Sequence, residues 1–499
     1  MRECGVLLPV ASLPSKYGIG TFSKEAYKFI DQLREAGQNY WQILPLGPTG
    51  YGDSPYQSFS AFAGNPYFID LDEFREQGLL TEKECQEADC GQNPVEISYE
   101  AIYKTRFQVL HKAYDRWKQR EEEAGKSVRE ELEASLGSET VDYCFYAAVK
   151  RAFGEKNWSE WDDDIKLRRP EAVSRYQKEL EDEICFYEFQ QSVFLRQWKK
   201  LKEYAHSKDI RIIGDIPIYV AFDSADSWAH PELFQFDEEC KPIAVAGCPP
   251  DAFSATGQLW GNPLYRWEYH KKTGYEWWMK RMRFSFELYD VVRVDHFRGF
   301  DQYYAIPAKD QTAENGKWED GPGISIFEKI KEEFGEVSII AEDLGFLTPS
   351  VLKLLKDTGF PGMKVLEFAF HAEDHSSYLP YHYNQNCVVY TGTHDNDTIA
   401  GWYKTLSSED RQFAQDYLNN RSSEESEIPW DFIRLALSST AQLAVIPMQD
   451  YLGLGNEARI NLPSTLGRNW TWRMKKGAFT PEIRKRCRQM NELYGRGVE

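Results

Sequence analysis

The sequence predicts an α/β fold, a parallel (β/α)8 TIM barrel with large helical and loop insertions. Eight short apolar runs, rich in β-branched residues and bounded by Gly, Pro or Asp, indicate buried strands. Most are separated by stretches with the spacing of amphipathic helices, and this alternation is typical of a parallel sheet covered on both faces. A doubly wound open sheet would share the pattern. The count of eight, and functional residues at the carboxyl ends of several strands, favour the barrel.

The candidate strands are distributed along almost the whole chain. They are Val6–Val10, Tyr40–Leu46, Ile210–Ile218, Tyr289–Val294, Val337–Ala341, Met363–Phe370, Cys387–Tyr390 and Leu443–Pro447. The first expected helix is Ser23–Ala36, with Ser23 as a suitable N-cap. Its apolar positions have helical spacing: Ala26, Phe29, Ile30 and Leu33. Similar patterns predict helices at Phe327–Phe334, Pro349–Thr358 and Trp430–Ser439.

Two long stretches interrupt this alternation. Residues 71–207 are charged and helical in pattern, and we expect a mainly helical insertion subdomain there. Its expected helices are Tyr99–Trp117, Thr140–Phe153 and Ala172–Tyr204, with Arg120–Gly137 as a solvated helix and loop. Residues 221–288, rich in Trp, Pro and Gly, are expected to form a wall and lid, as long insertions after barrel strands do. The barrel takes 1–70 for its start, 208–220 for its third strand and 289–499 for the rest.

Composition argues against several functional classes. The formal charge of −20 disfavours a nucleic-acid surface, which needs clustered Lys and Arg. Nine Cys without CxxC spacing fit reduced thiols better than a disulfide frame. The first residues lack the apolar region of a signal peptide, and no apolar run approaches the ~20 residues of a membrane span. We therefore expect a cytoplasmic protein without a nucleic-acid or membrane partner.

Acidic residues follow three of the expected strands. Asp295 ends the fourth, Glu342–Asp343 ends the fifth and Asp395 follows the seventh. Burying a carboxylate is costly unless it has partners, so three acids at one end of a sheet indicate a site. Paired carboxylates acting as nucleophile and acid/base are the usual equipment for cleaving glycosidic bonds.

Strand alternation places Arg293 and Asp295 on the same face. A guanidinium beside a carboxylate favours the ionised form that a nucleophile needs, although a purely structural Arg–Asp pair is the plainer interpretation. An acid/base carboxyl needs a less polar setting, which the apolar residues around Glu342 could supply. Alternation lets only one of Glu342 and Asp343 point inward, and spacing alone leaves that choice open.

The residues around the seventh strand admit two interpretations. Asp395 and His394 could orient sugar hydroxyls and stabilise positive charge on the sugar. A metal site at His296, His394 and the nearby acids is the alternative, but neither HxH nor HExxH spacing occurs. The chain also has 15 Trp and 29 Tyr, and we expect part of this aromatic set to line a carbohydrate cleft.

Arg-Val-Asp, Glu and His-Asp at these strand ends resemble the α-amylase clan of retaining glycosidases. Longer segments narrow the resemblance: Tyr40–Pro48, Ser54–Pro66, Gly214–Val220, Gly247–Ser254, Gly257–Pro263, Gln449–Asp450 and Leu452–Gly455. Together they resemble the 4-α-glucanotransferase family, also called amylomaltases or disproportionating enzymes, from about Gly5 to Trp472. One departure from typical amylases is the third strand, where Asp215–Tyr219 lacks their Asn-His ending.

The resemblance implies a role for each acid. Asp295 would be the nucleophile, Glu342 the acid/base and Asp395 the transition-state stabiliser, which decides between Glu342 and Asp343 by resemblance. Donor-side contacts are implied for Ser54, Tyr56, Asp215, Arg293, His394 and Asn461. Acceptor-side contacts are implied for Asp251, Phe253, Gln258 and Trp260. No metal and no cofactor is implied.

The implied reaction transfers a segment of an α-1,4-glucan to the 4-OH of an acceptor glucan or glucose through a covalent glucosyl-enzyme. Its partners would be starch- or glycogen-type α-1,4-glucans and maltooligosaccharides. Retention requires carboxyl groups ~5–5.5 Å apart, and transfer requires that water be kept out, for which residues 246–260 are the candidate cover. Competing classes are an α-amylase-type hydrolase, a glucan-binding protein with a decayed site and a metal-dependent barrel hydrolase. The sequence does not specify an oligomeric state.

Overall fold

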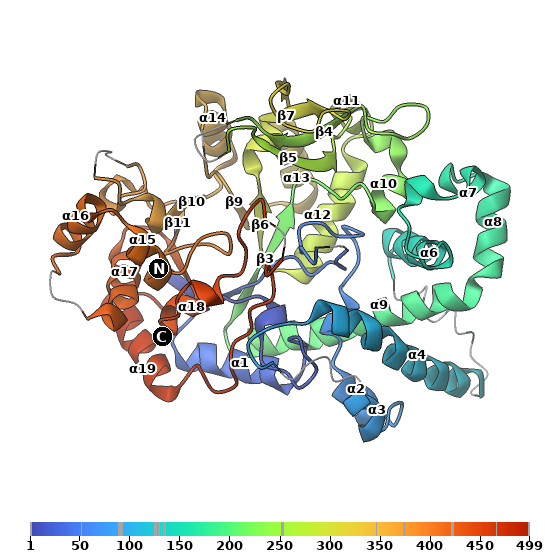
Figure 1. The fold of residues 1–499 in the computed structure, drawn as a ribbon, viewed down its shortest axis with the longest axis horizontal. Coiled ribbons are helices and arrows are strands. Elements are labelled where there is room, and N and C mark those ends of the chain that lie inside the picture. Colours follow the sequence, from blue (N-terminus) through green and yellow to red (C-terminus); the bar gives the residue numbers. More distant parts are fainter. Residues whose placement is uncertain are drawn as a thin grey trace.

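The centre of the molecule is a closed parallel barrel (Figure 1). The computed structural model describes residues 2–50, 52–87, 93–123, 127, 130, 132, 136–250, 254–345, 347–372, 376–420, 424–465 and 467–497. The strand order around the barrel is β1-β12-β11-β10-β9-β6-β3-β2. These are the eight strands expected from the sequence, so the predicted (β/α)8 barrel is confirmed.

The barrel strands differ from expectation mainly at their ends. They are β1 (Glu3–Leu7), β2 (Tyr40–Gln42), β3 (Arg211–Pro217), β6 (Val291–Asp295), β9 (Ile339–Ala341), β10 (Gly362–Val365), β11 (Cys387–Tyr390) and β12 (Leu443–Pro447). β1 and β2 end before Pro9 and Pro45, because proline has no N–H to donate to a neighbouring strand. β10 stops where its partner β11 stops, and a 3-10 turn, Leu366–Phe368, replaces the expected extension.

Alternate side chains of the strands fill the barrel interior. This inner cluster includes Leu7, Tyr40, Ile213, Val291, Ile340, Met363, Val388, Tyr390, Leu443 and Val445. The side chains between them point outward and pack under the helices in a larger cluster. Because the interior is filled by apolar groups, the polar side chains of the strands gather at the carboxyl ends, on one rim of the barrel.

Helices surround the barrel and build the insertions. Around the barrel lie α1 (Lys24–Glu35), α12 (Glu276–Leu288), α13 (Ile324–Phe334), α14 (Pro349–Thr358), α15 (Ile399–Thr405), α16 (Ser408–Leu418), α17 (Ile428–Ser438), α18 (Met448–Tyr451) and α19 (Pro481–Leu493). The insertions hold α2 (Leu71–Glu76), α3 (Glu82–Glu87), α4 (Tyr99–Glu123), α6 (Ser138–Ala152), α7 (Asp163–Lys166), α8 (Pro170–Glu179), α9 (Glu181–Ser207), α10 (Ala225–Ala229) and α11 (Trp267–Lys272). Ser23 is the N-cap residue of α1, but its side chain makes no capping hydrogen bond.

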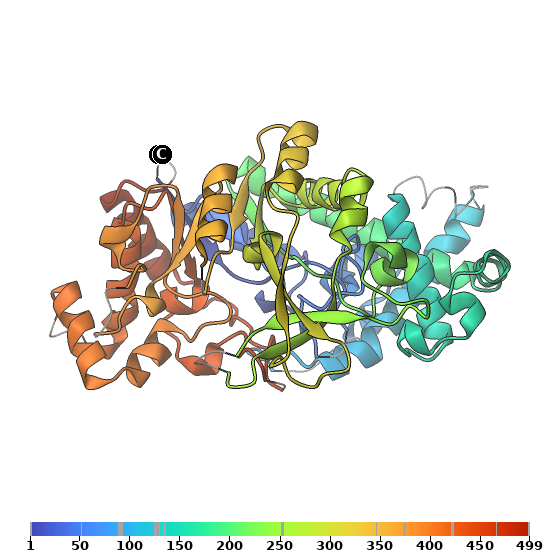
Figure 2. The ribbon, with the colours of Figure 1, turned by 90° about the horizontal axis from the view of Figure 1, so that it is seen from above.

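The helices of residues 71–207 lie to one side of the barrel in both ribbon views (Figures 1 and 2). The single helix expected at Ala172–Tyr204 is instead two, α8 and α9, because Leu180 leaves helical geometry with φ −108° and ψ 16°. α9 joins this subdomain to the barrel, since it packs against α4 and α6 as well as α1 and β3. Most of the expected Arg120–Gly137 segment after the end of α4 lies outside the described residues.

A second sheet forms a wall beside the carboxyl rim of the barrel. Its antiparallel order is β5-β4-β7-β8, with β4 at Ala244–Cys248, β5 at Gln258–Pro263, β7 at Gln302–Pro307 and β8 at Lys317–Asp320. β4 and β5 belong to the stretch expected to form a wall. β7 and β8 come from the chain after β6, so this wall sheet draws on both sides of the fourth barrel strand (Figure 1).

The first and last barrel strands close the barrel by pairing with each other, from Glu3↔Leu443 to Leu7↔Pro447. The buried guanidinium of Arg496 reinforces this seam, because it donates to the carbonyls of Glu3 and Ala441 at 2.8 and 2.7 Å. None of the helices that the structure describes is both long and apolar enough to cross a membrane.

Candidate active site

An ion pair at the bottom of the carboxyl rim organises the site. Asp215 on β3 and Arg293 on β6 are register partners on adjacent strands, so their side chains meet inside the barrel mouth. Arg293 Nη1 lies 2.8 and 2.6 Å from the two carboxylate oxygens of Asp215, which is fully buried. The Arg293 Nε–H points to the Met363 sulfur at 3.3 Å. The guanidinium is therefore fixed from two directions.

Asp295 extends this pair toward the opening. Its Oδ1 lies 3.0 Å from Arg293 Nη1, which confirms the expectation that the two side chains share a face. The Asp295 side chain is 31% exposed, whereas that of Arg293 is 4% exposed. Burial opposes the charge of Arg293, but Asp215 and Asp295 outweigh it and hold the Arg293 pKa well above its usual value. The Asp295 carboxylate is therefore supported by a buried guanidinium on one side and is accessible to a ligand on the other.

Glu342 stands beside Asp295 at the end of the adjacent strand. Val294 and Ala341 are register partners, so the residues that follow them are neighbours on the rim. The Glu342 carboxylate accepts hydrogen bonds from the His296 N–H at 2.7 Å and the Leu344 N–H at 2.8 Å. Burial by the surrounding protein raises the pKa of Glu342 to about 7, and the Asp295 charge adds to the rise. Arg293 and the two N–H groups oppose it.

Asp343, the competitor that the sequence left open, points elsewhere. Its Oδ1 accepts a hydrogen bond from the Met363 N–H on β10 at 2.6 Å, and the side chain is buried. Asp343 thus ties β9 to β10, while Glu342 faces the cleft. Burial raises the pKa of Tyr378, and the charges of Asp343 and Glu342 add to the rise.

Asp395 lies on the same rim, in the turn after β11, which β10 separates from β9. Asn461 Nδ2 donates to its Oδ1 at 2.7 Å, and His394 Nε2 lies 3.3 Å from the same oxygen. Burial alone would raise the pKa of Asp395, but the His394 charge and these hydrogen bonds lower it to about 2. Asp395 is therefore ionised at any pH near neutrality.

Three rings line the side of the site below Asp395. Tyr56 and His394 stack with centroids 5.1 Å apart, and Trp470 lies 5.9 Å from each of them. The Tyr56 hydroxyl donates to Asp215 Oδ2 at 2.9 Å, which links this ring cluster to the ion pair. Ser54 does not contact the acids; its Oγ accepts from the Tyr56 N–H at 3.3 Å and shapes the turn that presents Tyr56.

The opposite side of the site is formed by the wall sheet. Trp260 on β5 meets His296 edge to face at 4.9 Å, and its indole N–H donates to the Gln258 side chain at 3.1 Å. Tyr219, which follows β3, lies 6.3 Å from His296 and 6.4 Å from Trp260. Asp251 and Phe253, the other two residues expected here, lie outside the described residues.

Several site residues were missed by the sequence analysis. Trp470 lies on a loop two residues before Trp472, and no local pattern distinguishes it as the ring that reaches the site. Arg459 donates its Nε–H to the Asn461 carbonyl at 2.7 Å and also contacts the Asp395 carbonyl and the Asp397 carboxylate. It joins the loops after β11 and β12, two segments whose proximity no sequence spacing reveals. Its position two residues before Asn461 was the available hint.

The arrangement can cleave a glycosidic bond. One carboxylate is open and supported by a guanidinium, and its neighbour has a pKa near 7, which is how two carboxyls take the roles of nucleophile and acid. The third, Asp395, follows β11 on the same rim and is held ionised by His394 and Asn461. Among the described residues, no group of three or more His, Cys, Asp and Glu side chains is arranged to hold a metal ion.

Comparison with known proteins agrees with this chemistry. A sequence model of the 4-alpha-glucanotransferase family matches residues 8–479. The 4-alpha-glucanotransferase of Clostridium butyricum is 49% identical over 489 residues, covering 98% of this chain and 99% of that protein. That of Thermus thermophilus is 46% identical over 503 residues, covering 99% of each. The solved amylomaltase from Streptococcus agalactiae in complex with acarbose has a TM-score of 0.96 at 41% identity and covers 100% of both chains.

Proposed function

We propose a mechanism for this chain from the premise that it belongs to the 4-alpha-glucanotransferase family, and so is a glycosyltransferase of the hexosyl type. In this mechanism Asp295, Glu342 and Asp395 carry the reaction. The enzyme moves a segment of an α-1,4-glucan to the 4-OH of an acceptor glucan or glucose. The substrates are α-1,4-glucans and maltooligosaccharides.

In the first step, an Asp295 oxygen attacks the anomeric carbon of the donor. The bond from that carbon to the departing sugar's O4 breaks, and Glu342 gives its proton to this oxygen. A glucosyl ester of Asp295 forms, with inversion at carbon. Arg293, 3.0 Å from Asp295, supports and aligns the nucleophile.

In the second step, the 4-OH of the acceptor loses its proton to Glu342 and its oxygen displaces Asp295 from the anomeric carbon. The second inversion restores the original configuration. Asp395 stabilises the positive charge that develops on the sugar ring in both steps, and Asn461 and His394 hold it in place. Tyr56 and His394 flank the donor sugar.

The observation that carries this proposal is the contrast between two neighbouring carboxyls. Asp295 rests on a buried guanidinium, while Glu342 has a pKa of about 7 and receives two backbone N–H bonds. They follow register partners on adjacent strands, which lie ≈ 4.7–4.9 Å apart in a sheet. This supports the close spacing that retention requires, ~5–5.5 Å between carboxyl groups.

Product analysis on maltotriose tests the proposal. The transferase releases glucose while longer oligosaccharides appear, whereas an α-amylase-type hydrolase yields shorter sugars only. Asp295→Asn removes the nucleophile at nearly constant volume and should abolish both product series, with the thermal unfolding midpoint retained. Longer products formed by the Asp295→Asn variant at the rate of the original enzyme would refute the assignment.

A further inference from the structure

His296 follows the proposed nucleophile and has an unusual backbone. Its φ of 54° and ψ of 49° lie in the left-handed region, which residues other than Gly adopt at a steric cost. This turn aims the His296 N–H at Glu342 Oε2 at 2.7 Å. The next residue, Phe297, donates its N–H to the Glu342 carbonyl at 3.1 Å. Two consecutive N–H groups therefore bind both the side chain and the main chain of Glu342.

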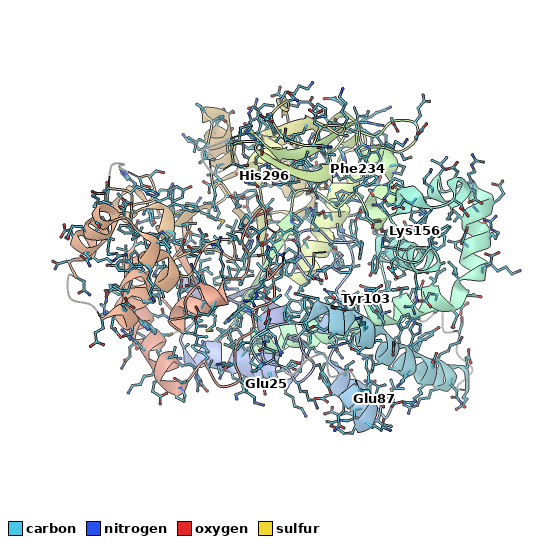
Figure 3. All side chains as sticks on the ribbon, in the orientation of Figure 1. Glu25, Glu87, Tyr103, Lys156, Phe234 and His296 are labelled. Carbon is cyan, nitrogen blue, oxygen red and sulfur yellow. The ribbon has the colours of Figure 1, made fainter. Side chains whose placement is uncertain are left out.

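The ring of His296 faces the wall sheet. It receives the Trp260 ring edge to face at 4.9 Å, with an angle of 89° between the planes (Figure 3 labels His296, beside this sheet). Gly299 also lies against this ring, since an added Cβ would stand 3.0 Å from His296 Cδ2 and 2.9 Å from Ile218 Cδ1. Within the part of the chain that the structure describes, no side chain forms a hydrogen bond with the ring nitrogens. Burial lowers the pKa of His296 to about 4, so the ring is neutral at neutral pH.

We propose that His296 is a positioning residue that couples the acceptor-side ring of Trp260 to the acid/base Glu342. The proposal rests on the roles assigned to Glu342 and Trp260 above. Its physical basis is that one residue contacts both groups, through its ring on one side and its N–H on the other. The turn at His296 is held by the barrel strand that ends at Asp295 and by Gly299, whose N–H donates to the His296 carbonyl at 3.0 Å.

The coupling has a functional consequence for the second step. An acceptor sugar that packs on Trp260 presses on the His296 ring, and the turn that carries this ring also holds the Glu342 carboxylate. The base is then best oriented when an acceptor is present. When water alone occupies the site, Trp260 and His296 are less constrained, and Glu342 is less well aimed. His296 would thereby favour transfer over hydrolysis.

A double-mutant cycle tests the first part of the proposal, the contact between the rings of His296 and Trp260. His296→Gly removes the ring and keeps the left-handed turn at no steric cost. Trp260→Ala removes the partner ring. We expect each single variant to lower the ratio of transfer to hydrolysis on maltotriose by between about twofold and tenfold, the range for an aromatic pair. The double variant should be no worse than Trp260→Ala alone, and additive losses would overturn the coupling.

The pH profile of transfer activity tests the second part of the proposal, the hydrogen bond from the His296 N–H to Glu342. The His296 N–H lowers the pKa of Glu342, so breaking the turn should raise that pKa and move the alkaline limb of activity to higher pH. His296→Val, for which a left-handed backbone is an outlier, should shift the limb, and His296→Gly should not. Equal limbs in the two variants would overturn this part of the proposal. If His296→Val does not yield folded protein, His296→Ala carries a related backbone penalty and replaces it.

Two further variants separate this inference from the proposed mechanism. Glu342→Gln should abolish transfer from maltotriose; if it does not, the assignment of the acid/base fails and the coupling fails with it. If Glu342→Gln is inactive but the double-mutant cycle is additive, the coupling alone fails. Gly299→Ala adds a methyl group that crowds both Ile218 and the His296 ring without removing a reactive group. A resulting shift of the ring, seen in a crystal structure of the variant, should lower the transfer ratio in the same direction as His296→Gly. An unchanged ratio with a displaced ring would contradict the coupling.

Discussion

The floor of the site and its wall are held together in different ways. On the floor, Arg293 contacts both oxygens of Asp215 and one of Asp295, and Tyr56 adds a further hydrogen bond to Asp215. On the wall, Trp260 meets His296 through the edge of a ring. Charge-assisted hydrogen bonds fix direction, whereas ring contacts tolerate small shifts. The floor is thus held in one geometry by charge, whereas the wall leaves its rings room to shift.

The largest expected effect comes from removing the charge at the centre of the floor. Arg293→Met leaves the buried Asp215 without its cation, and breaking a buried ion pair in this way costs roughly 3–5 kcal/mol. We expect the free energy of unfolding to fall by that amount and transfer from maltotriose to be lost. Urea unfolding at neutral pH and product analysis measure the two effects.

Arg293→Lys is the matched control for this change. Lysine retains the charge but not the planar fork that reaches Asp215 and Asp295 together. It should recover most of the stability and little of the activity. A stability of Arg293→Met equal to that of the original protein would show that the floor is not held by charge.

The next expected effect is the loss of activity at alkaline pH, which depends on the pKa of Glu342. In the proposed mechanism Glu342 must be protonated to assist the departing sugar, and its pKa is about 7. The value of kcat/KM on maltotriose should therefore fall about tenfold for each pH unit well above this pKa. Asp343→Asn is the control, because Asp343 bonds to the Met363 N–H away from the cleft and its loss should leave the alkaline limb in place. A limb that moves with Asp343→Asn would reverse the two assignments.

Asn461→Ala tests how much a single hydrogen bond to Asp395 contributes. It removes the 2.7 Å hydrogen bond to Asp395, and a hydrogen bond to a charged group is worth ≈ 1.5–3 kcal/mol. Because Asp395 is 44% exposed, we expect the lower end, about a tenfold fall in kcat/KM. The same loss raises the pKa of Asp395 from about 2, and a titration of this carboxyl by NMR should show its midpoint at higher pH. An unmoved midpoint would count against this hydrogen bond acting on Asp395.

The smallest effect is expected from the predicted cover, residues 246–260. We expect Phe253→Ala to raise hydrolysis relative to transfer while total cleavage of maltotriose changes little, because the residue is proposed to cover the site against water. The measurement is the ratio of free glucose to elongated products over the course of the reaction. An unchanged ratio would remove Phe253 from the cover.

The sequence was informative where local pattern decides structure. All eight barrel strands were predicted, because buried parallel strands are continuous β-branched runs that proline and glycine interrupt. The wall sheet was not predicted as a sheet. Its four strands lie in two insertions, and strand pairing across such distances leaves no local signature. The break between α8 and α9 at Leu180 was also missed, since no Gly or Pro marks it.

The site residues were predicted or missed for the same reason: a local pattern does not show which distant segments meet. Alternation paired Arg293 with Asp295 correctly, because both lie on one strand. It could not choose between Glu342 and Asp343, because that choice depends on where β10 presents the Met363 N–H. Trp470 and Arg459 reach the site from loops, and only the tertiary fold brings them to Tyr56 and Asp395. Asp251 and Phe253 keep the status of predictions.

The pairing of β1 with β12 has a consequence for how the protein is made. The ribosome must add more than 400 residues after Glu3 before Leu443, its partner at the seam, exists. At ≈ 5–20 residues per second this takes roughly 20 to 100 s. During that time the first strand has an unpaired edge, and the Arg496 guanidinium that secures it is made later still. The nascent barrel is thus an open sheet, and we expect it to need protection by chaperones until its last strand emerges.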